Sequence, residues 1–178
     1  MRKRMNTKTM VLAAMFLALA LVLPFFTGQI PQIGAMLCPM HIPVLLCGFF
    51  CGGPLGLVVG IIAPLLRSIL FGMPVMFPKA VCMAFELGAY GLVTGVMHQL
   101  VPKKKWMVYI SLIVAMLAGR IVWGIAMFAC VGFDTGAFGL SAFLAGAITN
   151  AIPGIILQLV LIPILVVTLE KYVHRQEV

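Results

Sequence analysis

One stretch of the sequence, residues 39–86, most constrains the fold, because it is apolar enough to lie in lipid yet carries ionisable side chains. A charge in the hydrocarbon core of a bilayer costs at least about 3 kcal/mol, so such side chains usually face a cavity or one another. Prolines in the stretch free backbone groups, which is tolerated at membrane depth only beside protein or water. We therefore interpret it as a polar binding pocket inside a membrane. The ionisable residues are His41, Arg67, Lys79 and Glu86, and the prolines are Pro39, Pro43, Pro54, Pro64, Pro74 and Pro78.

The composition predicts an all-α integral membrane protein. Of the 178 residues, 63% are hydrophobic and only 9% are charged, whereas soluble domains are about 25% charged. The apolar spans leave no room for a separate soluble domain, so we expect residues 1–178 to form one transmembrane domain. The first apolar run lacks a small-x-small cleavage site before Pro24, which disfavours a removable signal peptide.

The distribution of basic residues argues against nucleic-acid binding, although the net charge is +8. Most of them flank apolar spans, where they act as positive-inside signals. One orientation satisfies all three basic clusters and places both termini in the cytoplasm of a multi-pass protein of the cell membrane. The clusters are Arg2, Lys3, Arg4 and Lys8; Lys103, Lys104 and Lys105; and Lys171 with Arg175.

The apolar runs, each bounded by turn signals, predict a compact bundle of six transmembrane helices. The second run is short for a crossing, since a helix needs about 20 apolar residues to span the bilayer core. In the orientation above, the loops 27–38, 72–78 and 129–140 face outside. The predicted spans are Thr9–Phe26, Pro39–Cys51, Pro54–Phe71, Lys79–Val101, Trp106–Phe128 and Ser141–Leu169.

The intramembrane polar residues are expected in the outer half of this bundle. Glu86 lies seven residues beyond Lys79, about 10 Å deeper along a helix. A pocket open to the outside fits this asymmetry, whereas a continuous channel needs polar lining on both halves. The candidate substrate-binding residues are His41, Arg67, Lys79, Glu86, Arg120, Trp123, Thr149 and Asn150.

Five of these residues also have a structural interpretation. Arg67, Arg120 and Glu86 could form an internal ion pair that joins three helices. Two cations and one acid leave an excess positive charge, however, which an anion, water or Asp134 must compensate. His41 could simply begin a helix, and Trp123 could pack in the core. A metal site at Cys38, His41 and Glu86 is disfavoured because nothing fixes its geometry, and we expect no metal or cofactor.

Catalysis has little support in the sequence. It contains no Gly-x-Ser-x-Gly, no His-Glu-x-x-His, no P-loop and no paired intramembrane aspartates, the patterns that would indicate hydrolase, metalloprotease or ATPase chemistry. We therefore expect no enzyme, and any ATP hydrolysis would come from partner subunits. A membrane scaffold or assembly protein without a small ligand remains a second hypothesis.

Small residues at four-residue spacing predict close helix packing. Ala14 and Ala18 stand apart, because they lie on the first span, away from the polar residues. They would offer a smooth surface to another helix, although packing within the fold is an equal alternative. The other pairs are Gly48 with Gly52, Gly56 with Gly60, Gly91 with Gly95, and Ala115 with Gly119.

With these features, the chain resembles the substrate-binding S components of energy-coupling-factor (ECF) vitamin transporters along nearly its whole length. The Ala14-Met-Phe-Leu-Ala18 segment matches the Ala-x-x-x-Ala motif with which that family contacts its transmembrane coupling (T) subunit. The resemblance implies that T subunit, two cytoplasmic ATPase subunits, and an S component that topples in the bilayer to deliver its vitamin. The segments Pro39-Met-His-Ile-Pro43, Pro64-Leu-Leu-Arg67-Ser68 and Phe85-Glu86-Leu87 look most similar to the pantothenate type, and riboflavin, pyridoxine or cobalamin remain alternatives.

Overall fold

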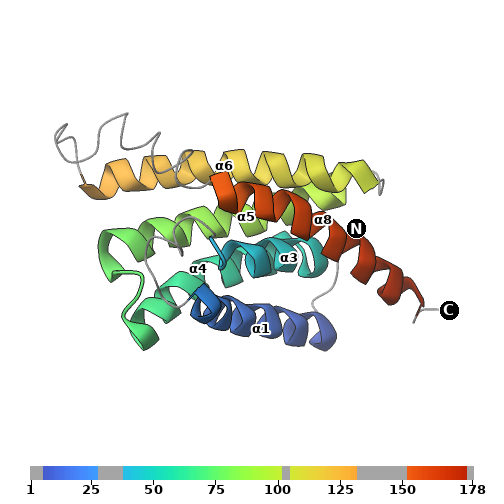
Figure 1. Cartoon of the computed structure of the whole chain (residues 1–178), viewed down its shortest axis with the longest axis horizontal. Coiled ribbons are helices and arrows are strands. Elements are labelled where there is room, and N and C mark those ends of the chain that lie inside the picture. The colour runs from blue at the N-terminus through green and yellow to red at the C-terminus, as the bar shows by residue number, and fades with distance from the viewer. Residues whose placement is uncertain (1–5, 28–37, 102–104, 132–151, 176–178) are drawn as a thin grey trace.

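The computed structural model describes residues 6–27, 38–101, 105–131 and 152–175. These residues form an all-α bundle of six α-helices (Figure 1). Two short irregular helices accompany them: η1 follows α1, and η2 lies between α4 and α5. The elements are α1 (Thr7–Val22), η1 (Leu23–Thr27), α3 (His41–Cys51), α4 (Gly53–Phe71), η2 (Met76–Ala80), α5 (Val81–Leu100), α6 (Lys105–Val131) and α8 (Ile152–Arg175).

Five segments of the described chain are long and apolar enough to cross a membrane, and α3 is a shorter apolar helix. At 1.5 Å per residue, the 11 residues of α3 reach only about 16 Å, roughly half of a bilayer core. The multi-pass all-α architecture predicted from the sequence is confirmed. Of the predicted sixth span, the part before residue 152 lies outside the described residues.

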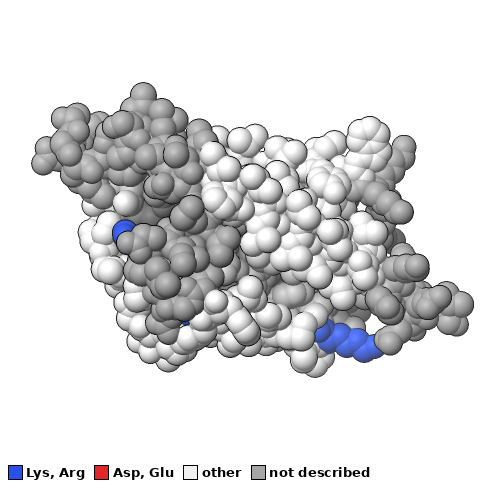
Figure 2. Space-filling view, viewed as in Figure 1, with Lys and Arg blue, Asp and Glu red and all other residues white. Residues whose placement is uncertain are grey.

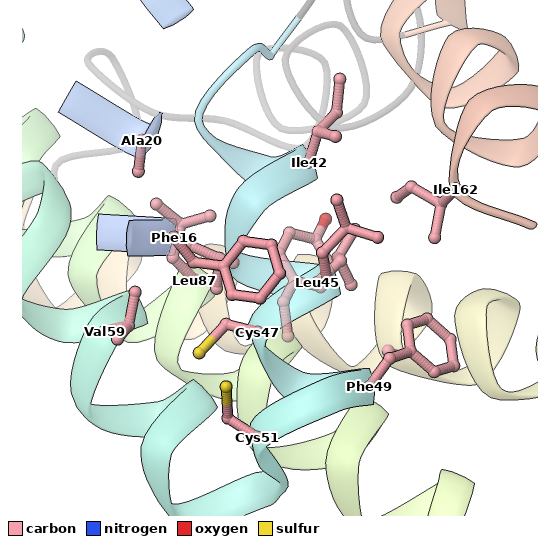
Figure 3. Packing of buried hydrophobic residues seen from close by; sticks show 14 of the residues in the cluster. Phe16, Ala20, Ile42, Leu45, Cys47, Phe49, Cys51, Val59, Leu87 and Ile162 are labelled. Carbon is pink, nitrogen blue, oxygen red and sulfur yellow. The ribbon is translucent and has the colours of Figure 1, made fainter. Parts of the chain in front are cut away.

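α3 lies at the centre of the bundle and is apolar on nearly every side. Nearly all of its side chains are buried, and Val44, Leu45 and Cys47 are fully inaccessible. Figure 3 shows α3 surrounded by side chains from four other helices, including Phe16 of α1 and Ile162 of α8. A helix that is hydrophobic all round is stable when protein or lipid encloses it, and α3 is too short to span the lipid by itself. The short length of α3 and its central position therefore agree.

Glycines let α4 and α5 pack backbone against backbone. A Cβ built on Gly56 would lie 2.6 Å from the carbonyl oxygen of Gly91, and one built on Gly91 would overlap the Gly56 backbone. Gly60 meets the backbone of Leu87 in the same way, and Gly95 meets that of Gly53. The close packing predicted from the glycine spacing is confirmed for this pair, and it fixes how α5 is turned toward the rest of the bundle.

The outer surface of the bundle is apolar. Large side chains such as Val11, Ile69 and Ile125 are more than half exposed. Among the residues that the structure describes, the face in Figure 2 shows Lys and Arg atoms only toward its ends. A soluble protein rarely exposes so much contiguous apolar surface. The exposed belt is the surface that lipid would cover.

The helix ends are grouped at the two ends of the bundle, and α1 has a buried and an exposed face. Figure 1 shows α1 beginning and α8 ending at the same end, whereas α4 passes to α5 at the opposite end. On α1, Ala13, Phe16 and Ala20 face the core, while Ala14 and Ala18 are exposed. The sequence therefore divides α1 into an inward face and a free face.

Candidate functional site

A buried carboxylate, Glu86 on α5, joins three helices. Arg120 Nη1 of α6 lies 2.9 Å from Glu86 Oε1, and the Tyr90 hydroxyl donates a 3.2 Å hydrogen bond to the same oxygen. His41 Nε2, on the first residue of α3, lies 3.5 Å from that oxygen. Glu86 is only 2% exposed and His41 only 3%. We call these four residues, His41, Glu86, Tyr90 and Arg120, the Glu86 cluster.

Glycine contacts set the positions of the helices that form this cluster. A Cβ on Gly48 of α3 would lie 2.7 Å from the carbonyl oxygen of Gly91, so α3 rests directly on the α5 backbone. A Cβ on Gly119 of α6 would lie 2.5 Å from Tyr90 Cε1, so the Tyr90 ring occupies the space that Gly119 leaves. The ring also packs edge-on against His41, with 5.1 Å between centroids. Any larger residue at Gly48 or Gly119 would separate the helices.

Cys38, just before α3, extends the cluster toward the preceding segment. Cys38 lies near enough to Arg120 for the Arg120 charge to act on its thiol. Desolvation raises the pKa of the Cys38 thiol, although the Arg120 charge opposes this shift. The thiol is therefore protonated and neutral at physiological pH, and Glu86 is the counter-charge of Arg120.

Arg67 lies in a different environment from Arg120, although the sequence placed both in one pocket. Its Nη1 donates a 2.6 Å hydrogen bond to the carbonyl oxygen of Leu21. Its guanidinium also lies over two aromatic rings, 5.0 Å from the Phe25 centroid and 5.4 Å from that of Phe71. The structure thus brings Arg120 and Glu86 together as expected but places Arg67 at the junction of α1, η1 and α4.

The remaining predicted site residues are spread more widely. Lys79 is exposed on η2, and Trp123 is half-buried on α6, three residues beyond Arg120. Thr149, Asn150 and Asp134 lie outside the described residues. The role of each in substrate binding stays a prediction.

Several buried polar groups were not anticipated from the sequence. Tyr90 follows Glu86 by four residues and therefore shares its helix face, which is a signal that the sequence contained. Thr94 continues that face, while Gln158 of α8 and Ser111 of α6 are isolated polar residues in apolar helices. Within the part of the chain that the structure describes, atoms in all three, and also both ring nitrogens of His41 and Nε of Arg120, are buried without a hydrogen-bond partner. Buried polar groups normally have a partner, so these atoms are candidates to contact a substrate or water.

Among the described residues, no group of three or more His, Cys, Asp or Glu side chains is arranged to hold a metal ion. The donors of the Glu86 cluster are a guanidinium, a phenol and an imidazole around one carboxylate. Such a set can recognise polar groups of an organic molecule through hydrogen bonds and charge.

Comparison with known proteins supplies the family. A search of curated protein sequences and a search of solved structures each returned no match. The family model described as "ECF transporter, substrate-specific component" matches residues 8–166, which include every helix from α1 to most of α8. Since this match extends over most of the chain, the protein belongs to the family of substrate-specific components of ECF transporters.

Proposed function

We propose that this substrate-binding subunit captures a small anionic vitamin, such as pantothenate, at the Glu86 cluster from the outside of the cell. The family match establishes a membrane subunit that binds the substrate of an ECF importer. The identity of the substrate is our inference from the residues of the cluster. ATP hydrolysis belongs, in this proposal, to two cytoplasmic partner subunits.

The observation that carries the proposal is the state of Arg120. One of its terminal nitrogens is held by Glu86, while its Nε is buried and has no hydrogen-bond partner among the described residues. The Arg120 side chain is 17% exposed, compared with 2% for Glu86, so it is the more accessible member of the pair. A guanidinium can bind two acceptors along its planar edge, which suits a carboxylate better than a neutral group.

The charge balance of the cluster makes His41 important. Arg120 and Glu86 neutralise each other, and Arg67 is engaged elsewhere. A bound carboxylate would therefore need one further positive charge. The imidazole of His41 is the remaining basic group of the cluster, and its Nε2 lies 3.5 Å from Glu86 Oε1. The hydroxyl and amide groups of pantothenate would use His41 or the predicted contacts Thr149 and Asn150.

Titration calorimetry on the detergent-purified chain tests this proposal. We expect Arg120→Ala to weaken pantothenate binding by about 2–5 kcal/mol, the range for truncating one partner of a buried charge pair. Arg120→Lys should recover only part of the affinity, because an ammonium lacks the planar fork. Repeating the titration in buffers of different ionisation enthalpy reports whether a proton is taken up on binding.

Arg67→Ala is the matched control in the same titration. It removes a second buried arginine whose described contacts lie at the α1–α4 junction. Equal loss of affinity in both variants would support the sequence prediction that Arg67 contacts the substrate. Unchanged affinity in both, or tight binding of a neutral or cationic vitamin, would contradict the anion site.

Native mass spectrometry of the purified chain addresses the alternatives, because tight ligands co-purify. If riboflavin, pyridoxine or cobalamin were found bound, that vitamin would replace pantothenate as the proposed substrate, and the proposed role in transport would stand. A protein that binds no vitamin in either measurement would favour the scaffold hypothesis.

We propose that Ala14 and Ala18 contact the T subunit. Both are exposed on α1 and too small to hold a neighbouring helix away. Ala18→Trp should abolish uptake and complex formation while leaving ligand affinity unchanged. Val58→Trp, at a position on α4 that is 48% exposed, is the control for a bulky residue on the lipid face. Normal complex formation by Ala18→Trp would exclude this surface.

The proposed orientation has cytoplasmic termini and a cytoplasmic Lys103–Lys105 turn. A cysteine introduced at Lys104 should resist an impermeant thiol reagent added to intact cells and react after permeabilisation. Labelling from outside would reverse the orientation and, with it, the direction from which substrate enters.

A further inference from the structure

The N-terminus of α3 is buried at the Glu86 cluster. His41 is the first residue of this helix; its Nε2 lies 3.5 Å from Glu86 Oε1, and its ring packs edge-on against that of Tyr90. Figure 3 shows Ile42 at this end of α3. Met40, His41 and Ile42 are each at most 5% exposed. The start of the helix is therefore shielded from water.

One backbone amide at this end has no acceptor in the described backbone. A helical turn precedes α3, because Met40 has helical dihedral angles and the His41 amide donates to the Cys38 carbonyl at 3.0 Å. The amide of Ile42 donates to neither carbonyl within its reach, those of Cys38 and Pro39, both of which the structure describes. The Met40 side chain forms no capping hydrogen bond. A buried N–H needs an acceptor, so the Ile42 amide is a donor that a ligand can use.

The His41 side chain offers a second donor at the same place. It is only 3% exposed, and its Nε2 approaches Glu86 without forming a hydrogen bond. Neither ring nitrogen has a hydrogen-bond partner in the described parts of the chain. An imidazole carries at least one N–H in either protonation state. Two adjacent residues of the first turn thus present a backbone donor and a side-chain donor.

We propose that the carboxylate of the substrate binds at the N-terminus of α3, where it accepts hydrogen bonds from the Ile42 amide and the His41 ring beside Arg120. This inference rests on the proposed function, because it assigns donors that hold the anion. The aligned peptide dipoles of a helix act like about half a positive charge at its N-terminus, and the amides there bind anions. The helix thereby adds positive potential that Arg120, already paired with Glu86, does not supply alone.

Glu86 is the other anion near this helix end. Its Oε1 already accepts a hydrogen bond from Tyr90 and lies 2.9 Å from Arg120 Nη1, so its charge is compensated from the α6 side. If Glu86 also satisfied the start of α3, the Ile42 amide would not respond to added substrate. The response of that one amide therefore separates the two arrangements.

Nuclear magnetic resonance of the full chain in detergent measures this response. Carbonyl carbon-13 histidine combined with nitrogen-15 isoleucine selects one amide, because His41–Ile42 is the single His-Ile pair in the sequence. Labelled phenylalanine and cysteine select the Cys51 amide in the same way, since Phe50–Cys51 is the single Phe-Cys pair. With pantothenate, the Ile42 amide proton should move downfield, because a hydrogen bond to a carboxylate is charge-assisted. The Cys51 proton, at the other end of α3, should not move.

A carboxylate built into the helix start provides a second test. Cys38 begins the turn with φ +47°, a conformation that Asp and Asn adopt more readily than most residues, and both cap helices well. Cys38→Asp should occupy the anion position and weaken pantothenate binding by at least about thirtyfold, because like charges then meet. Cys38→Asn, which has the same shape without the charge, should weaken binding only about fivefold, the equivalent of one capping bond. Both variants should melt no lower than the wild type.

The proposed function and this inference fail in different ways. A wild-type protein that does not bind pantothenate would overturn both. If pantothenate binds and Arg120→Ala weakens it, an unmoved Ile42 proton or equal affinities of Cys38→Asp and Cys38→Asn would overturn the α3 site alone. If Cys38→Asp does not fold, the Ile42 proton of the wild type decides.

Discussion

The two buried arginines of this bundle are held in opposite ways. Arg120 faces a carboxylate, Glu86, at 2.9 Å, and is also near the Tyr90–Glu86 hydrogen bond. Arg67 is even less exposed, at 3%, yet its described partners are a carbonyl oxygen and two aromatic rings. A guanidinium inside a membrane protein can therefore be stabilised by a counter-charge or by neutral dipoles and π faces, and only the first arrangement joins it to a titratable partner.

The carbonyl that receives Arg67 is available because of a change in helix type. α1 ends at Val22 and continues as the 3₁₀ helix Leu23–Thr27, which contains Pro24. Proline has no N–H, and 3₁₀ bonds run from i to i+3, so carbonyls in the last α-helical turn lose their i+4 donors. Arg67 supplies a donor to Leu21, which links α4 to the end of α1.

The largest effect should come from removing the counter-charge. Glu86→Ala leaves the Arg120 charge unpaired in a buried site, which costs about 3–5 kcal/mol of unfolding free energy. Unfolding in mixed detergent micelles measures this loss. The double variant Glu86→Gln/Arg120→Gln should recover much of it, because both charges are then absent. A Glu86→Ala variant as stable as the wild type would show that Glu86 and Arg120 do not form an ion pair in the protein.

Arg67→Ala should cost less, about 2–3 kcal/mol, because it removes a charge-assisted hydrogen bond and two cation–π contacts but leaves no opposite charge behind. The same unfolding measurement applies. Arg67→Lys should restore part of the loss, since an ammonium can donate to Leu21 but does not stack as a plane on Phe25 and Phe71. If the double variant Arg67→Ala/Glu86→Gln regained all of the lost stability, Arg67 would instead belong to the Glu86 cluster.

Tyr90→Phe should have a smaller effect within the Glu86 cluster, about 0.5–1.5 kcal/mol, because it deletes one hydrogen bond and keeps the ring that packs on Gly119 and His41. Arg120 still neutralises Glu86 in this variant. Unfolding of the wild type, Tyr90→Phe, Arg120→Gln and the double variant forms a double-mutant cycle. Strict additivity would indicate that the phenol and the guanidinium do not act on the same carboxylate.

Lys79→Ala should change stability least, by at most about 0.5 kcal/mol, because Lys79 is exposed on η2. The sequence analysis assigned Lys79 to the substrate site. The affinity of the Lys79→Ala variant for pantothenate should therefore be measured together with its stability. A loss of affinity without a loss of stability would keep Lys79 as a substrate contact. A stability loss comparable to that of Arg67→Ala would mean that Lys79 makes a structural contact.

The sequence by itself determined the class of this protein and the ends of most of its helices. Runs of apolar residues between turn signals place four of the five long helices within a few residues of their observed bounds, because in lipid the backbone must satisfy its own hydrogen bonds. The predicted start of the sixth span, at residue 141, lies outside the described residues. The glycine spacing on α4 and α5 also predicted their close packing, since a missing side chain acts locally and in a fixed direction.

Only the tertiary structure decided which cation meets Glu86. Arg67, Lys79 and Arg120 are equivalent candidates in the sequence, and a pairing within 3 Å depends on how separate helices are rotated and translated. That placement comes from contacts distant in sequence, such as Gly119 against Tyr90 and Gly48 against Gly91. The central position of α3 was equally undetermined, because a helix that is apolar on every side does not indicate which neighbour it faces.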